Sequence, residues 1–409
     1  MFAVFAEELF KGRQLMSAVL EGIRVLDFGR YIAGPFCGTL LADMGAEVIR
    51  IEKVDGSEDR FTTPITPQGE GAGYVQLARN KKGLTLNPRK PEGAEIVRKL
   101  VETADVVIAN LPQPTLISMG LDYDSLKAIK PDIILTTVSA YGSTGPYAEK
   151  VGFDGVAQAM SGNMHMGGVD GQPMKSFVPY CDFGTASLCA FGTLAAIIHR
   201  MNTGEGQHVE GSLLRTSLTF NNANLIEEAI LGLGRVGTGN RGQGSAPVDA
   251  IPTKNGWIMM QVVGNPLFER WAKLMGEDHW MTDNRFSTDQ LRGDNAADIS
   301  ARTREWAADK TNEEALAILA DHRIPCGEVL KPADALKNEH VVETGIFNSV
   351  DYPGLSGGAP IAGTPVSLSK APGTIRHRAP TLGEHTDDLL QELGYSSDQI
   401  ENLRHDRIV

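Results

Sequence analysis

The first 142 residues alternate short, apolar, β-branched runs with helical patterns, and this alternation limits the possible folds more than any other feature of the chain. Residues 23–28 (IRVLDF) and 46–53 (AEVIRIEK) have the pattern of strands, and the loop and helix between them complete a βαβ unit. A helix over 91–104 and strands over 105–111 and 132–142 continue the series. Strands separated by helices predict an open, mainly parallel sheet, whose ligands bind beyond the carboxyl ends of the strands.

The rest of the chain predicts a second, smaller domain. Residues 187–201 are apolar on every face, which predicts a buried helix. Residues 251–264 predict a hairpin that turns at Asn255–Gly256, and helical patterns follow it. We expect a large α/β domain over 1–224, a small domain over 225–330, and a return to the large domain over 331–409.

Composition excludes several classes of protein. The chain has 51 acidic residues against 38 Lys and Arg, a net charge of -13, and no basic patch that would bind nucleic acid. Its four cysteines have no metal-binding spacing, so we expect reduced thiols, no metal and a cytoplasmic location. We also expect the first twenty residues to form a helical extension without a targeting role, and no run to reach the roughly 18 apolar residues of a membrane span.

Asp182 is a single acid in an otherwise small and apolar stretch, residues 178–197 (VPYCDFGTASLCAFGTLAAI). The structural interpretation makes it the N-cap of a helix that begins near Thr185. The functional interpretation makes it a nucleophile, because a carboxylate at a helix N-terminus stays ionised near neutral pH and can attack an activated acyl carbon. The pattern alone leaves both open.

A glycine-rich stretch, residues 237–242 (GTGNRG), fits a dinucleotide-binding motif by spacing only. The residues after it cannot form the helix that such a site requires. Glu52 does follow the second predicted strand, where a ribose-binding acid would stand, so a nucleotide-binding oxidoreductase remains a weaker alternative.

Six blocks in a fixed order then carry a resemblance to a known family. They begin at Leu20 with LEGIRVLDFGRYIAGPFCGTLLADMGAEVIRIEK and continue with RNKKGLTLN, SAYGSTGPYAEKVGFDGVAQAMSG, CDFGTASLCAFGTLAAIIHRMNTGEGQHVEGSLL, IPCGEV and APTLGEHT. Together they resemble the family III CoA-transferases, also called the CaiB/BaiF family. The resemblance implies a Rossmann-like large domain built from both chain ends, a smaller α+β domain, and an interlocked, ring-like homodimer.

The resemblance also implies a reaction and a nucleophile. Asp182 matches the family's catalytic aspartate, which moves CoA from an acyl-CoA thioester to a free carboxylic acid through an aspartyl anhydride and an aspartyl-CoA thioester. Such an exchange needs no metal and no tightly bound cofactor, since acyl-CoA and a small acid are its substrates. Backbone amides of Phe183 and Gly184 could donate to the oxyanion.

The implied binding residues fall into two groups. A glycine loop said to cover the aspartate matches Gly239, Gly242 and Gly244, although here the loop is short. The implied CoA contacts follow the predicted strands or belong to the motif RNKKG: Tyr31, Ile32, Ala33, Lys53, Asn80, Lys81, Lys82, Asn110 and Leu111. The chain departs from the family near Ser118 and Ile32, where many relatives have other polar residues.

One alternative enzyme class has the same fold, and the sequence does not identify the acceptor acid. The α-methylacyl-CoA racemases resemble this chain but carry Gly-His-Asp where it has Gly152, Phe153 and Asp154, and phenylalanine cannot move a proton. Small dicarboxylates, oxalate-like acids and carnitine-type acids all remain possible acceptors. A dicarboxylate would need a cation for its distal group, for which we consider Arg241.

Overall fold

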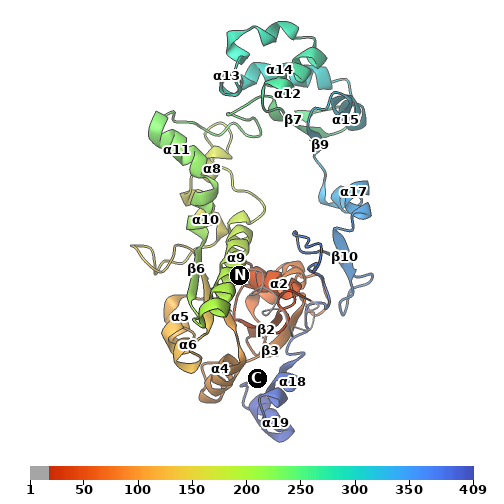
Figure 1. Ribbon diagram of the computed structural model, residues 1–409. Helices are drawn as coiled ribbons and strands as arrows, with labels where there is room; N and C mark the ends of the chain where they lie inside the picture. The colour runs from red at the N-terminus through yellow and green to blue at the C-terminus, as the bar shows by residue number, and fades with distance from the viewer. Residues whose placement is uncertain (1–17) are drawn as a thin grey trace, which may run out of the picture. The chain divides into compact units, whose positions relative to one another are not determined.

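A six-stranded sheet forms the centre of the larger part of the chain (Figure 1). The computed structural model describes residues 18–409, so most of the predicted N-terminal extension lies outside it. Every neighbouring pair of strands is parallel, in the order β3-β2-β1-β4-β5-β6, which confirms the mixed α/β fold with a parallel sheet. The strands are β1 (Arg24–Asp27), β2 (Glu47–Glu52), β3 (Lys81–Thr85), β4 (Val106–Ala109), β5 (Ile134–Ser139) and β6 (His208–Ser212). The strand order reverses between β1 and β4, where sheets of this type bind ligands.

By its contacts the chain divides into two compact units. Unit 1 comprises residues 1–161, 178–222 and 345–409, and unit 2 comprises residues 162–177 and 223–344. The domain boundaries near 224 and 330, and the interlocked ring-like dimer, stay predictions.

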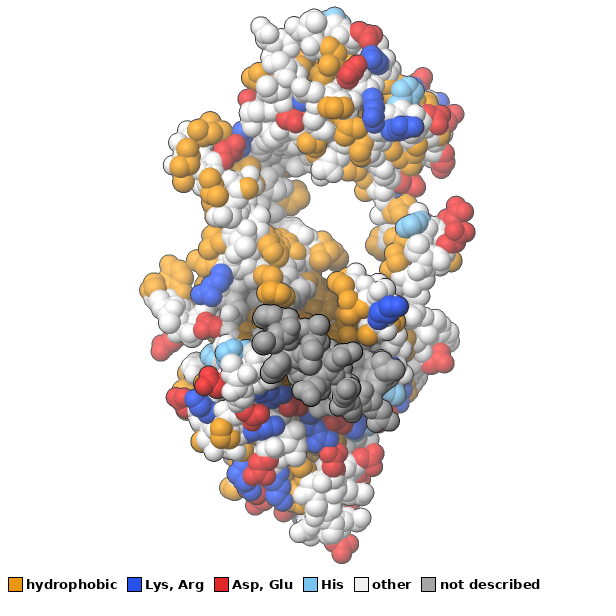
Figure 2. All heavy atoms as spheres, viewed as in Figure 1, with side chains coloured by type: hydrophobic (Ala, Val, Ile, Leu, Met, Phe, Trp, Pro, Cys, Tyr) orange, Lys and Arg blue, Asp and Glu red, His pale blue; other side chains and the backbone are white. Residues whose placement is uncertain are grey.

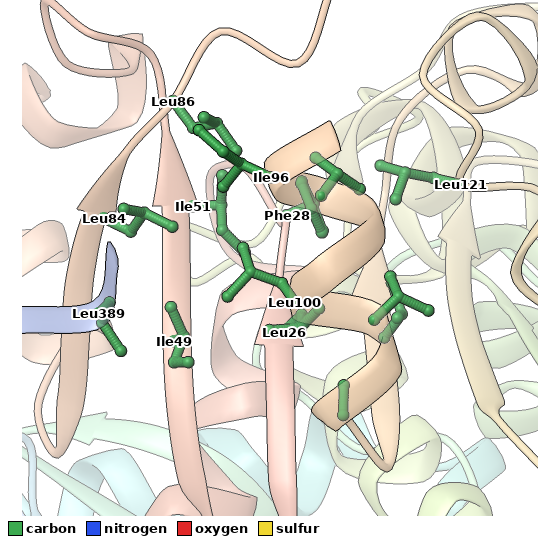
Figure 3. Close-up of a cluster of buried hydrophobic side chains, with 14 of the residues drawn as sticks. Leu26, Phe28, Ile49, Ile51, Leu84, Leu86, Ile96, Leu100, Leu121 and Leu389 are labelled. Carbon is green, nitrogen blue, oxygen red and sulfur yellow. The ribbon is translucent and has the colours of Figure 1, made fainter. Parts of the chain in front are cut away.

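Helices cover both faces of the sheet in unit 1, because successive strand residues point to opposite faces. Leu26 and Ile49 face one core, shown in Figure 3, whereas Val25 and Val48 face the other. The first core contains residues of α4 (Pro91–Thr103), α18 (Thr386–Glu392) and α19 (Ser397–His405), and the second contains residues of α2 (Ala33–Asp43) and α9 (Tyr180–Thr203). The remaining elements of unit 1 are a 3-10 helix (Glu58–Phe61), α3 (Ala72–Leu77), α5 (Gln113–Ser118), α6 (Tyr123–Ile129), α7 (Asp154–Met160), α10 (Leu213–Phe220), β10 (Phe347–Val350) and β11 (Ala359–Ala362).

Helix α9 is less buried than its composition predicts. Its inner residues pack on α2, β5 and β6, but Leu188, Phe191 and Ile198 are 46%, 71% and 59% exposed. Within residues 18–409 it is the one helix whose length and hydropathy reach those of a membrane span, contrary to the expectation from the sequence. Core helices of globular proteins share this property, and the inner face of α9 belongs to such a core.

Unit 2 has a three-stranded antiparallel sheet with the order β7-β8-β9. The hairpin between β7 (Val248–Pro252) and β8 (Trp257–Gln261) confirms the predicted turn at Asn255–Gly256. A core around Trp271 and Phe268 joins this sheet to the unit's main helices. The other elements assigned to unit 2 are α8 (Asn163–Met166), α11 (Asn222–Leu231), α12 (Asn265–Met275), 3-10 helices (Asp278–Met281 and Asn284–Phe286), α13 (Asp289–Asp294), α14 (Ala296–Ala307), α15 (Asn312–Asp321), β9 (Cys326–Glu328), α16 (Pro332–Ala335) and α17 (Glu339–Glu343).

Candidate active site

Asp182 lies in the first turn of α9 and does not cap the helix. The helix begins at Tyr180 with Pro179 as its N-cap, so Asp182 is the third helical residue. Within the described part of the chain, its carboxylate accepts no hydrogen bond. The structural interpretation of Asp182 as an N-cap is therefore wrong.

Asp154 performs the capping that the sequence assigned to Asp182. It is the first residue of α7, it is buried, and its Oδ1 accepts the backbone N–H groups of Cys181 at 2.7 Å and Asp182 at 3.2 Å. Gln158 donates to the other oxygen, Oδ2, at 2.5 Å. A carboxylate from another helix thus satisfies the free amides at the start of α9 and places a second acid beside Asp182.

This environment changes the acidity of Asp182. Burial and, secondarily, the negative charge of Asp154 raise the pKa of Asp182 from its usual 3.8 to about 7. We expected an ordinary pKa from the sequence, because a helix N-terminus favours the ionised form. That expectation is wrong chiefly because the Asp182 side chain is buried, and the amides at the start of α9 bond to Asp154 and not to Asp182. An Asp182 carboxylate without hydrogen-bond donors is poorly solvated, which suits a nucleophile.

The proposed oxyanion donors are not free. The N–H of Phe183 donates to the carbonyl of Pro179 at 3.1 Å, and Gly184 already lies inside the helical ladder. The donor role expected of these two amides is corrected accordingly, since α9 starts five residues earlier than the sequence suggests. Gly184 has a packing role instead, because a Cβ there would lie 2.7 Å from the ring of Phe220.

The loop between β1 and α2 lies against the start of α7, and the first turn of α2 lies against the start of α9. The ring of Tyr31 meets Phe153 edge-on, with centroids 5.6 Å apart, and Phe36 meets Phe183 in the same way at 5.0 Å. Ile32 is the N-cap of α2, which begins at Ala33 and has no side-chain cap and no acid in its first turn. The structure therefore brings the predicted CoA loop, Tyr31 to Ala33, close to the helix that carries Asp182.

The other predicted CoA contacts divide between the two edges of the sheet. Lys53 is exposed at the carboxyl end of β2, where it pairs with Glu58, and Asn110 and Leu111 follow β4 at the same edge. Lys82 lies at the opposite edge, near the start of β3, and pairs with Glu47 at 2.5 Å. The sequence did not predict β3, and a parallel strand that begins at Lys81 cannot present its first residues to the carboxyl edge.

Two further predicted contacts are held inside the fold. Lys81 is fully buried and binds Asp27 at 2.8 Å and the carbonyl of Pro35 at 2.7 Å. The amide of Asn80 donates to Asp43 and to the carbonyl of Thr374. Neither side chain is available to CoA in this structure, which corrects both assignments.

An exposed cation that follows the carboxyl end of β3 was not singled out from the sequence. Arg89 is exposed in the loop after this strand. The apolar residues Leu84 and Leu86 could have indicated a strand that ends near them. Arg89 would then have been expected just beyond the carboxyl end of that strand.

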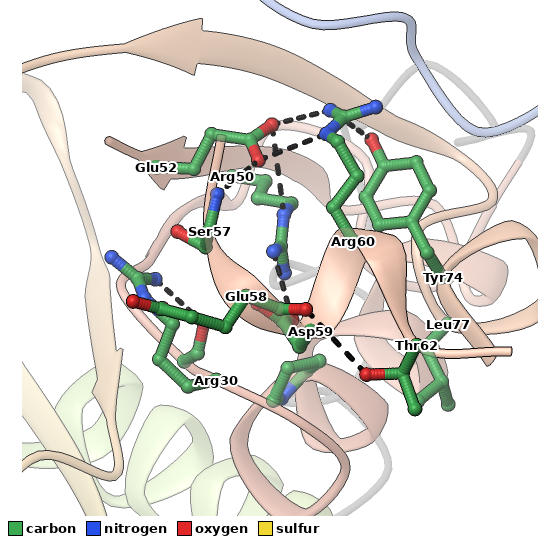
Figure 4. Close-up of polar contacts among 12 residues, drawn as sticks. Arg30, Arg50, Glu52, Ser57, Glu58, Asp59, Arg60, Thr62, Tyr74 and Leu77 are labelled. Atoms are coloured by element: carbon green, nitrogen blue, oxygen red, sulfur yellow. Dashed lines mark hydrogen bonds and ion pairs between the residues drawn. The ribbon is translucent and has the colours of Figure 1, made fainter. Parts of the chain in front are cut away.

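Glu52 has a structural role. It is fully buried and bonded to Arg60, with Arg50 3.9 Å away and Tyr74 also hydrogen-bonded to Arg60 (Figure 4). The two guanidinium groups hold the pKa of the Glu52 carboxyl below its usual value against the effect of burial, which alone would raise it. A carboxylate with these partners cannot bind a ribose, so the oxidoreductase alternative loses its acid.

The glycine stretch belongs to unit 2. Gly239 has a positive φ of 68° and donates to the carbonyl of Gly168 at 2.8 Å, and Gly242 donates to that of Val248 at 2.7 Å. A Cβ on Gly244 would meet nothing within 4 Å. Arg241 makes no side-chain hydrogen bond or ion pair with any described residue. The covering role of this loop stays a prediction.

Comparison with known proteins identifies the family of the chain. The chain matches CoA-transferase family III over residues 20–386. It is 32% identical over 394 residues to a succinyl-CoA–D-citramalate CoA-transferase of Chloroflexus aurantiacus, covering 95% of this chain and 98% of that protein. A succinate–glutarate CoA-transferase of Agrobacterium fabrum is 33% identical over 388 residues, covering 91% and 95% respectively.

Solved structures give the same result. A CaiB/BaiF family protein from Brucella suis has a TM-score of 0.81 and 32% identity, with 92% of this chain and 99% of that chain covered. These matches extend over most of both chains. The chain therefore belongs to CoA-transferase family III, the CaiB/BaiF family, and is a CoA-transferase.

Proposed function

We propose that this protein moves CoA from an acyl-CoA thioester to a free carboxylic acid, with Asp182 as the nucleophile. The observation that carries the proposal is the carboxylate of Asp182, which accepts no hydrogen bond within the described residues and lies on the helix that packs against α2, the helix directly after the β1–α2 loop. This acid is both buried enough to be reactive and close to the edge where sheets of this type bind ligands.

The reaction proceeds in balanced steps. An oxygen of ionised Asp182 attacks the thioester carbonyl, and the C–S bond breaks to release CoA thiolate and leave an aspartyl-acyl anhydride. The thiolate attacks Cγ of Asp182, which releases the donor acid and leaves an aspartyl-CoA thioester. The acceptor carboxylate then attacks Cγ and again releases the thiolate, which attacks the acceptor's acyl carbon and frees Asp182. One thioester replaces another, so no external energy source is needed.

The relatives suggest the substrate class. Two of them are named for succinyl-CoA or succinate together with a second dicarboxylate. Arg241, which has no ion-pair partner among the described residues, is our candidate for the distal carboxylate of such an acid. We therefore propose succinyl-CoA as the first donor to test and four- or five-carbon dicarboxylates as the first acceptors.

CoA itself would bind at the carboxyl edge of the sheet. We propose the backbone amides of Ile32 and Ala33 for its phosphates. Neither amide donates a hydrogen bond to a described residue, and an uncapped helix N-terminus without acids attracts anions. Lys53 would add a point charge and Leu111 an apolar contact. Together with Tyr31, these residues remain from the predicted set once those that point inward or lie at the opposite edge of the sheet are removed.

The homodimer remains part of the proposal. Helix α11 exposes Ile226, Ile230 and Leu231 by 56%, 76% and 62%, and Figure 2 shows such apolar side chains uncovered on this helix. The outer face of α9 is exposed in the same way. Exposed apolar helix faces favour a protein interface, and light scattering of the purified protein would measure the mass of the assembly.

Intact mass measurement tests the nucleophile. Protein incubated with succinyl-CoA in the absence of an acceptor should carry an adduct that hydroxylamine removes and that maps to Asp182. Asp182→Asn should bind CoA and form no adduct, and Asp170→Asn, at an exposed acid of unit 2, provides the matched control. Adduct formation by Asp182→Asn would refute the assignment.

A further inference from the structure

Tyr31 has a backbone conformation that a bulky residue rarely adopts. Its φ is 61°, in the left-handed region, and its side chain is 45% exposed at the edge of Phe153. A non-glycine residue holds such a conformation only where its surroundings enforce it, and such positions cluster at functional sites. The residues on both sides of Tyr31 should therefore be fixed by strong contacts.

The residue before Tyr31 is held by Asn110, which follows β4. The Oδ1 of Asn110 accepts the N–H of Arg30 at 2.7 Å, and its Nδ2 donates to the carbonyl of Arg30 at 2.7 Å. A Cβ on Gly34 would lie 3.2 Å from this amide, so the position favours glycine. Both ends of the Asn110 amide are used on one peptide segment, in the manner of a neighbouring strand.

The side chain of Arg30 also holds the loop through hydrogen bonds. Its Nη1 donates to the carbonyls of Phe28 at 3.0 Å, Gly29 at 2.8 Å and Ile51 at 3.1 Å, which ties the loop to the end of β2. Three carbonyl acceptors on one nitrogen leave the guanidinium turned inward, away from a ligand.

The buried ion pair of Asp27 and Lys81 holds the two ends of the loop. Asp27 accepts the N–H of Gly29 at 2.8 Å, and Lys81 donates to Asp27 and to the carbonyl of Pro35 at 2.7 Å. The loop is thus held at both ends by groups from β1 and β3, and at its centre by groups from β2 and β4.

We propose that Asn110 and Arg30, supported by the Asp27–Lys81 pair, form a clamp that holds Tyr31 in its left-handed conformation. Asn110 and Lys81 are then positioning residues that act through the loop and not ligands of CoA. The purpose of the clamp rests on the proposed function, because the loop it fixes is the one assigned to CoA. The clamp itself is a property of the free protein.

Hydrogen–deuterium exchange of the free, full-length protein tests the clamp without any substrate. Asn110→Ala should speed exchange of the amides in residues 29–36 by tenfold or more, because it removes both bonds to Arg30. Asn110→Asp, which keeps the acceptor and loses the donor, should have a smaller effect. Asn338→Ala is the matched control, since that asparagine also bonds a backbone amide but caps α17.

A double variant separates the clamp from general loosening. Asparagine tolerates a positive φ, so Tyr31→Asn combined with Asn110→Ala should exchange more slowly in 29–36 than Asn110→Ala alone. Titration of the wild-type protein with CoA provides the functional comparison. If the wild type does not bind CoA, that result counts against the proposed function and not against the clamp. If Asn110→Ala weakens CoA binding while exchange in 29–36 equals that of the wild type, Asn110 is a direct ligand and the clamp is refuted. Should Asn110→Ala fail to fold, Arg30→Ala, which removes the three bonds from Nη1 to the carbonyls of Phe28, Gly29 and Ile51, provides a second exchange test.

Discussion

Replacing Asp154 by asparagine should move the acid limb of the pH–rate profile. Asparagine keeps an oxygen for the amides of Cys181 and Asp182 and is itself a preferred cap, so the start of α9 should be retained. Gln158 can turn its amide to accept where it now donates. The variant therefore removes one negative charge beside Asp182 with little change in shape.

The size of the effect follows from the geometry. Asp154 Oδ1 lies 3.2 Å from the backbone nitrogen of Asp182, which places the two carboxyl groups on the order of 5 Å apart. At an effective dielectric constant of about 20 their repulsion is at most ~3 kcal/mol, and partial exposure of Asp182 reduces it to about 1.4 kcal/mol, or one pKa unit. Burial, the larger cause, remains, so the pKa of Asp182 should fall from about 7 to roughly 6.

The assay is kcat/KM for succinyl-CoA between pH 5 and 9. Asp182 attacks in its ionised form, so activity should fall below pH 7 in the wild type and below about pH 6 in Asp154→Asn. At pH 6 the ionised fraction rises from about a tenth to about a half, which predicts a variant roughly five times as active as wild type relative to each plateau. An acid limb that stays in place or moves to higher pH would refute the reasoning.

Three other variants test separate parts of the structure. Asp182→Asn should raise the free energy of unfolding, measured in urea, by on the order of 2–4 kcal/mol at pH 8 and leave it unchanged near pH 3. The reason is that a folded-state pKa raised from 3.8 to about 7 costs stability only where the acid is ionised. Equal stabilisation at both pH values would contradict this. Gly184→Ala should destabilise by about 1–3 kcal/mol, measured in the same way, since its Cβ would lie 2.7 Å from Phe220, whereas an unchanged midpoint would show that the ring moves freely. Arg241→Ala should raise the KM of a dicarboxylate acceptor and leave that of the acyl-CoA donor unchanged, and an equal rise in both would remove Arg241 from the acceptor site.

The strands that the sequence predicted are the ones with a strong local signal. Residues 23–28 and 46–53 are β-branched, apolar and bounded by turns, and β1 and β2 lie within them. The strand β3 was missed because it begins with two lysines and contains a glycine, which is the composition of a loop. Its neighbours in the sheet, and not its own residues, make it a strand.

The candidate site also has one part that the sequence predicted and one part that it did not. The position of Asp182 could be recognised from the short-range pattern around it, but its role as the third residue of α9 depends on where that helix begins. The cap comes from Asp154, 28 residues earlier, and no local pattern reports a contact over that distance.

Local sequence therefore determined the alternation of strands and helices, the family and the acid of interest, because these depend on side-chain periodicity and on short motifs. Tertiary structure decided which edge of the sheet each lysine reaches, which side chains turn inward to hold the β1–α2 loop, and how acidic Asp182 is. Those properties arise from burial and from charges brought together by folding: Asp27 meets Lys81, and Asp154 meets Asp182, only after the sheet and its helices have assembled.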